Sequence, residues 1–140
     1  PSTRLHSQHD PGAVSIANKV QGREPLLIHP TAATARGIEE GSVVRVFNDR
    51  GACLAGARIT EHISPTVVVL STGAWFDPTA PGELERHGNP NVLTLDKGTS
   101  RLAQGPISQT TLVEVQAFQG EIPEVQAFTP PDLGGHTTRG

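Results

Sequence analysis

Glycine and proline interrupt this chain so often that a long helix has little room to form. The 140 residues include 15 glycines and 12 prolines, about 19 % of the total. This share lies below that of low-complexity sequence, but it predicts many short elements joined by turns. With glycine included, the apolar residues reach about 46 %, the ordinary value for a globular domain. We therefore expect one turn-rich domain that is mainly β.

The clearest strands flank a polar turn near the middle of the chain. Residues 42–47 and 52–60 are rich in β-branched and apolar side chains, and the turn between them ends on Gly51. This pattern predicts a β-hairpin. Every second residue from Cys53 to Ile59 is apolar, so we expect one buried face and an inert, buried Cys53.

Three further short elements follow from local patterns. The alanine-rich segment 31–36 lies between Pro30 and Gly37, which predicts a short helix. Residues 66–70 form a continuous apolar and β-branched run, which predicts a strand buried on both sides. Apolar alternation in residues 110–118 predicts a last strand.

A long polar loop separates the last two predicted strands. Loops of roughly thirty residues are more often binding surfaces than simple connections. Residues 83–109 are rich in amides and hydroxyls, which suit either a polar heterocycle or the capping of turns, and the composition leaves both interpretations open. Trp75, the only tryptophan, could form the wall of a ligand pocket, but we favour its plugging one end of a barrel.

The pentapeptide Glu-Val-Gln-Ala-Phe occurs at residues 114–118 and again at 124–128. One repeat of five residues, offset by ten, is too little to indicate a solenoid. We interpret the two copies as edge or tail segments. The last residues are polar and rich in proline and glycine, so we expect a domain over residues 1–128 and a flexible C-terminal tail over 129–140.

Charge and hydropathy exclude several classes of partner. The 11 basic and 14 acidic residues give a net charge of -3, with no basic run, which argues against nucleic acid and membrane surfaces. The longest apolar run, residues 67–70, is far short of the roughly 20 residues of a membrane helix. No signal peptide occurs in these residues, so we expect a cytoplasmic protein, and a periplasmic one if a leader precedes them.

Common catalytic and metal-binding motifs are missing. The sequence contains no G-x-S-x-G, H-E-x-x-H, G-x-x-x-x-G-K-[ST] or G-x-G-x-x-G, which argues against a self-sufficient hydrolase or P-loop enzyme. His6 and His9, next to Asp10, have a spacing that could begin a metal site. Without a second ligand cluster, we favour ordinary surface histidines and expect no metal ligand in this chain.

Seven sequence blocks together resemble one known family. They are RLHSQ (4–8), VQGREP (20–25), HPTAATARGI (29–38), VRVFNDRG (44–51), GAWFDP (73–78), HGNPNVLT (87–94) and GTSRLAQG (98–105) continuing through QT (109–110). In this order they are similar to the C-terminal domain of the molybdopterin-dependent S- and N-oxide reductases. The resemblance covers about residues 4–118, and its specificity lies in the collinear order of the blocks.

The resemblance implies a mainly β fold, a double-psi β-barrel with short helices, that binds the molybdenum cofactor bis(molybdopterin guanine dinucleotide). The whole enzymes of the family reduce dimethyl sulfoxide, trimethylamine N-oxide or biotin sulfoxide by oxygen-atom transfer. The sequence His87-Gly88-Asn89-Pro90 favours the biotin sulfoxide type. The molybdenum ligand and the substrate funnel belong to larger domains of such a parent reductase. We therefore expect no catalysis by this chain alone.

Carried over by position, the pterin contacts of the family fall on a small set of residues with fitting chemistry. Amides can pair with the pterin edge, and hydroxyl or backbone groups can meet a phosphate. Asp96 is a further acceptor that could meet the amino-pyrimidine edge. The alternative from another class is a free-standing β-barrel module that binds a small polar ligand or a protein without a redox role. The implied cofactor-binding residues are His6, Ser7, Gln8, Asn91, Ser108 and Gln109.

Overall fold

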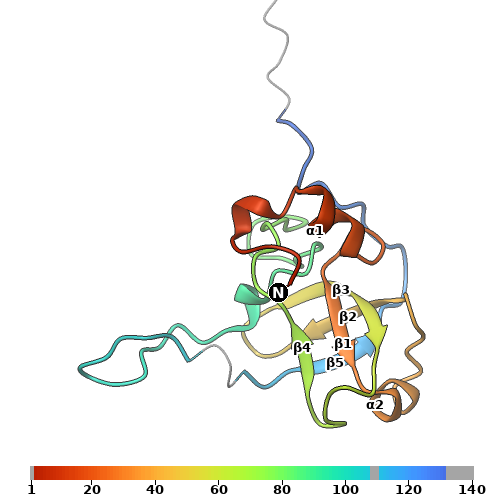
Figure 1. The fold of residues 1–140 in the computed structure, drawn as a ribbon, viewed down its shortest axis with the longest axis horizontal. Helices are drawn as coiled ribbons and strands as arrows, with labels where there is room; N and C mark the ends of the chain where they lie inside the picture. The colour runs from red at the N-terminus through yellow and green to blue at the C-terminus, as the bar shows by residue number, and fades with distance from the viewer. Residues whose placement is uncertain (1, 108–110, 132–140) are drawn as a thin grey trace, which may run out of the picture.

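The computed structural model describes residues 2–107 and 111–131, which form one mixed β-sheet with short helices around it (Figure 1). The strands lie in the order β4-β1-β3-β2-β5. The prediction of a mainly β domain is confirmed. The strands are β1 (Pro25–Ile28), β2 (Val43–Phe47), β3 (Ala52–Ile59), β4 (Val68–Leu70) and β5 (Glu114–Ala117); the helices are α1 (Ala13–Asn18) and α2 (Pro30–Thr34), with 3-10 turns η1 (Ser7–His9) and η2 (Pro90–Leu93).

The predicted hairpin is present as β2 and β3. The strands are antiparallel, with Val46 opposite Cys53, and the Asn48 side chain accepts a hydrogen bond of 2.9 Å from the backbone N–H of Arg50 in the turn. The prediction of a single buried face is wrong, because β3 is buried on both faces from residue 53 to 57. Its second face is covered by Val20, which leaves no room for a side chain at position 56. Residue 85 instead pairs with the edge of β3, through backbone hydrogen bonds to residues 52 and 54.

One interior strand of the sheet, β1, is not identified from the sequence. Strand β1 lies between β3, to which it is parallel, and β4, to which it is antiparallel. Leu26 and Ile28 of β1 are fully buried and pack in one core with Val44, Val46 and Cys53. Cys53 is a core residue as predicted, and burial raises the pKa of its thiol.

The segment 66–70 is not the doubly buried strand that its composition predicts. Only residues 68–70 form a strand, β4, which lies at an edge of the sheet with β1 as its single neighbour. Val67 is 47 % exposed and Val69 39 % exposed. Strand β5 forms the other edge and is shorter than the predicted 110–118. The described residues therefore form a five-stranded half-barrel.

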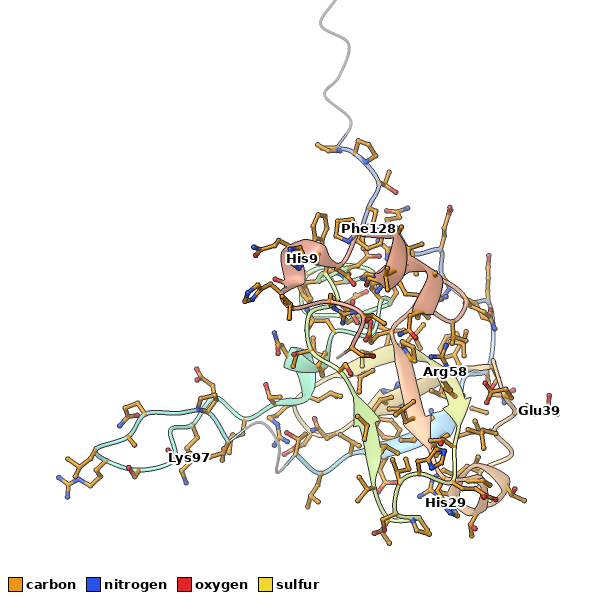
Figure 2. The ribbon with its side chains drawn as sticks, in the orientation of Figure 1. His9, His29, Glu39, Arg58, Lys97 and Phe128 are labelled. Atoms are coloured by element: carbon orange, nitrogen blue, oxygen red, sulfur yellow. The ribbon has the colours of Figure 1, made fainter. Side chains whose placement is uncertain are left out.

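The predicted short helix is present as α2, and the long loop is largely without regular structure. Helix α2 begins after His29, whose ring nitrogen accepts a hydrogen bond from Thr31, and the chain turns at Gly37 with a φ of 61°. Between β4 and β5 the only regular element in the described residues is η2. Residues 95–107 project from the domain as an arm, on which Lys97 is marked in Figure 2. No helix in residues 2–107 or 111–131 is long and apolar enough to cross a membrane.

Candidate functional site

A groove of about 680 Å³ opens beyond the carboxyl end of β4. Three stretches that are far apart in sequence form its walls: residues 4–7, which lead into η1 and include its first residue, residues 72–76 after β4, and Asn89 with Asn91 at the start of η2. The groove thus lies where the N-terminal segment, the end of an edge strand and the long polar loop meet.

The groove brings together three of the predicted cofactor-binding residues. His6, Ser7 and Asn91 all line it, and all three are exposed. Their side-chain polar atoms have no hydrogen-bond partner within the described residues, so they remain available to a ligand. Gln8 follows Ser7 in η1 and lines a neighbouring hollow beside α1. Asp96 is exposed and directly precedes Lys97, which Figure 2 shows on the projecting arm.

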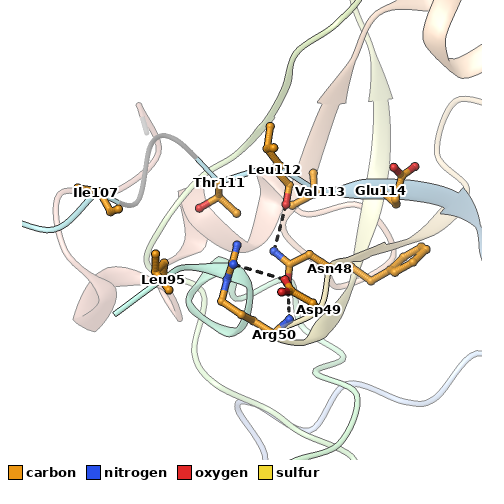
Figure 3. A pocket seen from close by; sticks show the side chains of 10 residues that line it. Asn48, Asp49, Arg50, Leu95, Ile107, Thr111, Leu112, Val113 and Glu114 are labelled. Carbon is orange, nitrogen blue, oxygen red and sulfur yellow. Dashed lines mark hydrogen bonds and ion pairs between the residues drawn. The ribbon is translucent and has the colours of Figure 1, made fainter. Parts of the chain in front are cut away.

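Two of the predicted residues, Ser108 and Gln109, lie outside the described residues. Their neighbours Ile107 and Thr111 line a second hollow of about 410 Å³ beside the β2–β3 turn (Figure 3). There Asn48 donates hydrogen bonds to the carbonyl oxygens of Leu93, at 2.9 Å, and Leu112, at 3.1 Å. Asn48 thus links the β2–β3 turn to Leu93 and Leu112, which lie at the two ends of the loop between η2 and β5.

Trp75 is a wall of the groove and not the barrel plug that the sequence analysis favours. The residue is 39 % exposed, and its indole N–H donates a hydrogen bond of 2.6 Å to the carbonyl oxygen of Ser7. Phe76 beside it is 60 % exposed. A tryptophan that follows a buried strand would be expected to fill the end of a barrel. Strand β4 is instead a partly exposed edge strand, and the tryptophan that follows it lines the groove.

The backbone of Trp75 is held from two sides by buried side chains. Its N–H donates to Asp10 Oδ2 at 3.0 Å, and its carbonyl oxygen accepts from His87 Nδ1 at 2.9 Å. Burial, together with the nearby Lys19 ammonium, lowers the pKa of His87, which favours the neutral ring. Because a carbonyl oxygen can only accept a hydrogen bond, the proton of that ring lies on Nδ1. Asn89 donates from its amide to the carbonyl oxygen of Ala74 at 3.0 Å, which fixes the preceding residue as well.

Beneath this wall lies a buried cluster of two cations and two carboxylates. Arg4 contacts Glu24 at 3.0 Å, and Lys19 contacts Asp10 at 2.8 Å and Glu24 at 3.3 Å. No side chain in the cluster is more than 3 % exposed. Burial alone would raise the pKa of Asp10, but the hydrogen bond and charge of Lys19 leave that pKa below its usual value. The charges balance, so the floor of the groove carries no net charge from this cluster.

The loop wall at residues 87–91 is folded around a second buried carboxylate, Glu85. Its two oxygens accept hydrogen bonds from the backbone N–H groups of residues 77, 87, 88 and 89, at 2.7 to 3.2 Å. Burial nevertheless raises the pKa of Glu85. Gly88 has a φ of 92°, and a Cβ there would lie 2.7 Å from the Cβ of Glu24. The turn therefore packs directly on the charged cluster.

Sequence reasoning missed the residues that support the groove. Arg4, Asp10, Lys19 and Glu24 are charged residues, and such residues are expected on the surface unless partners bury them. The pairing that buries them is set by the fold. Asp10 points into this cluster, while the rings of His6 and His9 are 6.0 Å apart. Within the described residues no three side chains of His, Cys, Asp or Glu are grouped to hold a metal ion.

The fold and groove define a mainly β domain with an open groove that polar and aromatic residues line. The family model described as "Molydopterin dinucleotide binding domain" matches residues 1–112. The chain belongs to this family of cofactor-binding domains.

Curated relatives show which proteins contain such a segment. The chain is 47 % identical over 135 residues to a trimethylamine-N-oxide reductase of Salmonella typhi and 45 % over 134 residues to a dimethyl sulfoxide/trimethylamine N-oxide reductase of Rhodobacter capsulatus, with 94 % of the chain covered in both. It is 46 % identical over 121 residues to a biotin sulfoxide reductase of Cereibacter sphaeroides, with 86 % covered. The chain spans about 16 % of the length of each. These identities do not separate the three kinds of reductase, so the preference for the biotin sulfoxide type stays a prediction.

Proposed function

We propose that this chain is the C-terminal cofactor-binding domain of a molybdenum reductase and forms one side of the site for bis(molybdopterin guanine dinucleotide). In this proposal the whole enzyme reduces S- or N-oxides by oxygen-atom transfer, and the remaining domains of the parent reductase supply the other side of the site. The domain extends through residue 128, and its open half-barrel is part of a double-psi β-barrel.

The single observation that carries the proposal is the convergence of His6, Ser7 and Asn91 on one groove. Their polar atoms are not used within the described part of the protein, and Trp75 adds a flat aromatic wall. A pterin is planar and presents donors and acceptors along its edge, which amides can match. The amide of Asn91 is suited to that edge, and the hydroxyl of Ser7 to a phosphate or ring substituent.

The electrostatics of the groove fit such a ligand. The Arg4 guanidinium lies at the floor and is paired with Asp10 and Glu24, so recognition depends on placed hydrogen bonds more than on net charge. Gly73 brings the loop backbone close to this guanidinium, because a Cβ at that position would lie 2.7 Å from Arg4 Nε. The groove is open and is lined by polar and aromatic residues, which suits one face of a cofactor held between domains.

When bound, the cofactor supplies the oxygen-atom transfer at molybdenum. The residues of this chain bind one side of the pterin, orient it through fixed amides and hydroxyls, and exclude water from that side. Because the groove presents half a site, we expect the 140-residue chain alone to fold and to bind free cofactor weakly. Tight binding in a titration with the isolated chain would refute the half-site arrangement.

The double substitution Asn91→Ala with Gln109→Ala, made in a full reductase that contains this domain, tests the proposal. We expect lower molybdenum and pterin content in the purified protein, measured by metal analysis and pterin fluorescence. The matched control is Glu39→Gln, on an exposed residue at another part of the surface (Figure 2), which should leave the content unchanged. If the double variant also retains its cofactor, a binding module without a redox role becomes the better explanation.

A further inference from the structure

The C-terminal segment 121–128, which we call the strap, packs against the back of the groove. It follows β5 and lies beyond residues 1–112, the part of the chain that the family model matches. It contains the second copy of the Glu-Val-Gln-Ala-Phe sequence. Figure 2 shows Phe128 at the same end of the molecule as His9.

Buried charges anchor the strap through two backbone groups and the side chain of Gln126. The N–H of Gln126 donates to Asp77 Oδ2 at 2.7 Å, and Asp77 is only 6 % exposed. Arg86 bridges both partners, donating to Asp77 Oδ1 at 2.9 Å and to Gln126 Oε1 at 3.3 Å. The buried guanidinium of Arg23 donates to the carbonyl oxygen of Pro123. Three charged side chains of the main body therefore bind the strap at two points along its length.

The anchored strap places one aromatic ring against the groove wall. Phe128 meets Trp75 edge to face, with ring centroids 5.3 Å apart and an interplanar angle of 72°. It meets His87 in the same way at 5.2 Å and 90°. The ammonium of Lys19 lies 5.9 Å from the centre of the Phe128 ring. Phe128 thus contacts the indole of Trp75 and one of the two residues that hold its backbone.

We infer that the strap is a positioning element of the groove, in which Phe128 fixes the orientation of the Trp75 indole. Asp10 and His87 hold only the backbone of Trp75, which leaves the side-chain torsions free. The indole itself is held by one hydrogen bond to Ser7 and by the ring of Phe128. An edge-to-face pair has a preferred geometry, so it restricts rotation where a simple apolar contact would not. The effect on ligand binding rests on the proposed function; the effect on Trp75 does not.

The first copy of the repeated sequence provides a matched control. Phe118 occupies the position in 114–118 that Phe128 occupies in 124–128, and its N–H bonds to the carbonyl oxygen of Val43 at the end of β5. None of the aromatic ring contacts in the described residues involves Phe118. Removing this ring therefore changes the same residue type in the same local sequence without touching the groove wall.

Because Trp75 is the only tryptophan, its fluorescence in the 140-residue chain reports on the wall directly. In Phe128→Ala we expect emission at longer wavelength and stronger quenching by acrylamide, while Phe128→Tyr restores both values and Phe118→Ala changes neither. Phe128→Leu keeps an apolar side chain without the ring, and it should shift the emission in the same direction if Phe128→Ala fails to fold. Equal spectra for the wild type and the folded Phe128 variants would overturn the inference.

A second measurement separates this inference from the proposed function. The same variants are titrated with neopterin monophosphate by equilibrium dialysis. We expect Phe128→Ala to weaken binding about fivefold, which corresponds to about 1 kcal/mol, the contribution of one aromatic pair. Unchanged affinity, in a protein whose Trp75 spectrum has shifted, would contradict a role in the groove. If the wild type does not bind the probe at all, the proposed function fails, while the fluorescence still decides whether the strap positions Trp75.

Discussion

The carboxylate of Asp10 and the backbone N–H of Trp75 are joined by a hydrogen bond of 3.0 Å across 65 residues of sequence. This contact ties the segment that contains His6 and Ser7 to the loop after β4. Both lie on the groove, so the buried charged cluster under Asp10 sets the distance between two of its walls. Changes in that cluster should therefore affect stability and the groove together.

Removing the charge of Asp10 should destabilise the domain strongly. In Asp10→Asn, Arg4 and Lys19 keep their charges while only Glu24 remains to balance them. Breaking a buried ion pair from one side costs about 3–5 kcal/mol, which urea unfolding would measure. The control is Asp49→Asn, whose partner is Arg50 on the surface, and it should change the unfolding free energy by less than about 0.5 kcal/mol. Similar values for the two variants would contradict the role of the cluster.

Burial of neutral His87 predicts a loss of stability on acidification. Its folded pKa lies below the ordinary value of 6.5, so the unfolded chain binds a proton that the folded chain does not. Stability is therefore full above about pH 6.5 and falls as the pH decreases toward the folded pKa.

Other groups near His87 titrate as well, so the comparison must be made between variants. Asp10, with its lowered pKa, loses its contribution only below its ordinary value of 3.8. Glu85 has a raised pKa, so its contribution is present below 4.5 and is lost as the pH rises through its folded pKa. Compared with the wild type, His87→Gln should flatten the dependence of the unfolding free energy on pH between about pH 6.5 and 4.5. An equally steep curve for His87→Gln would count against a buried neutral imidazole.

Replacing Glu85 by glutamine should disrupt the turn that carries Asn89. The carboxylate accepts four backbone N–H bonds, and an amide puts an NH2 group where one of the two acceptor oxygens was. Leaving buried donors unpaired should lower the unfolding free energy by about 2–3 kcal/mol. Glu83→Gln, two residues away and exposed, is the matched control and should have little effect. Calorimetry of the two variants decides the question, and equal midpoints would show that the turn does not depend on the carboxylate.

A side chain at Gly73 should be tolerated less well than one at Gly82. Both glycines have a positive φ, 107° and 79°, so alanine is strained at either position. At Gly82 the new Cβ meets nothing within 4 Å, and the cost should be about 1–2 kcal/mol. At Gly73 the new Cβ meets the buried Arg4 guanidinium, so the loss of stability should be larger than at Gly82. The loop that forms this wall of the groove should also be displaced. Chemical denaturation of both proteins provides the test, with equal losses speaking against a tight contact.

The features that sequence predicts here are those set by neighbours in the chain. The β2–β3 hairpin follows from two apolar runs and a polar turn, and helix α2 from Pro30 and Gly37. Strand β1 is different, because its partner in parallel pairing, Gly56 to Ile59, is some thirty residues away. Parallel pairing leaves no local turn signal, and the apolar run of residues 26–28 is too short to indicate by itself which strand it pairs with.

The errors at the candidate site share a physical cause. An apolar run such as 66–70 reports that its residues suit a strand, but not how many neighbours that strand has. The expectation that this strand is buried on both sides also underlies the interpretation of Trp75 as a plug. The grouping of His6, Ser7 and Asn91 follows from the family resemblance and not from their own spacing. Their supports, Asp10 and Glu85, are acidic residues whose burial depends on donors from distant segments.

The position of β5 and Phe128 bears on how such a domain can be exchanged between proteins. The family match ends at residue 112, whereas β5 begins at Glu114 and the ring against Trp75 comes still later. A chimera spliced at the end of the match would graft a sheet without its last strand and a tryptophan without its aromatic neighbour. The smallest transplantable piece, on this geometry, reaches as far as residue 128.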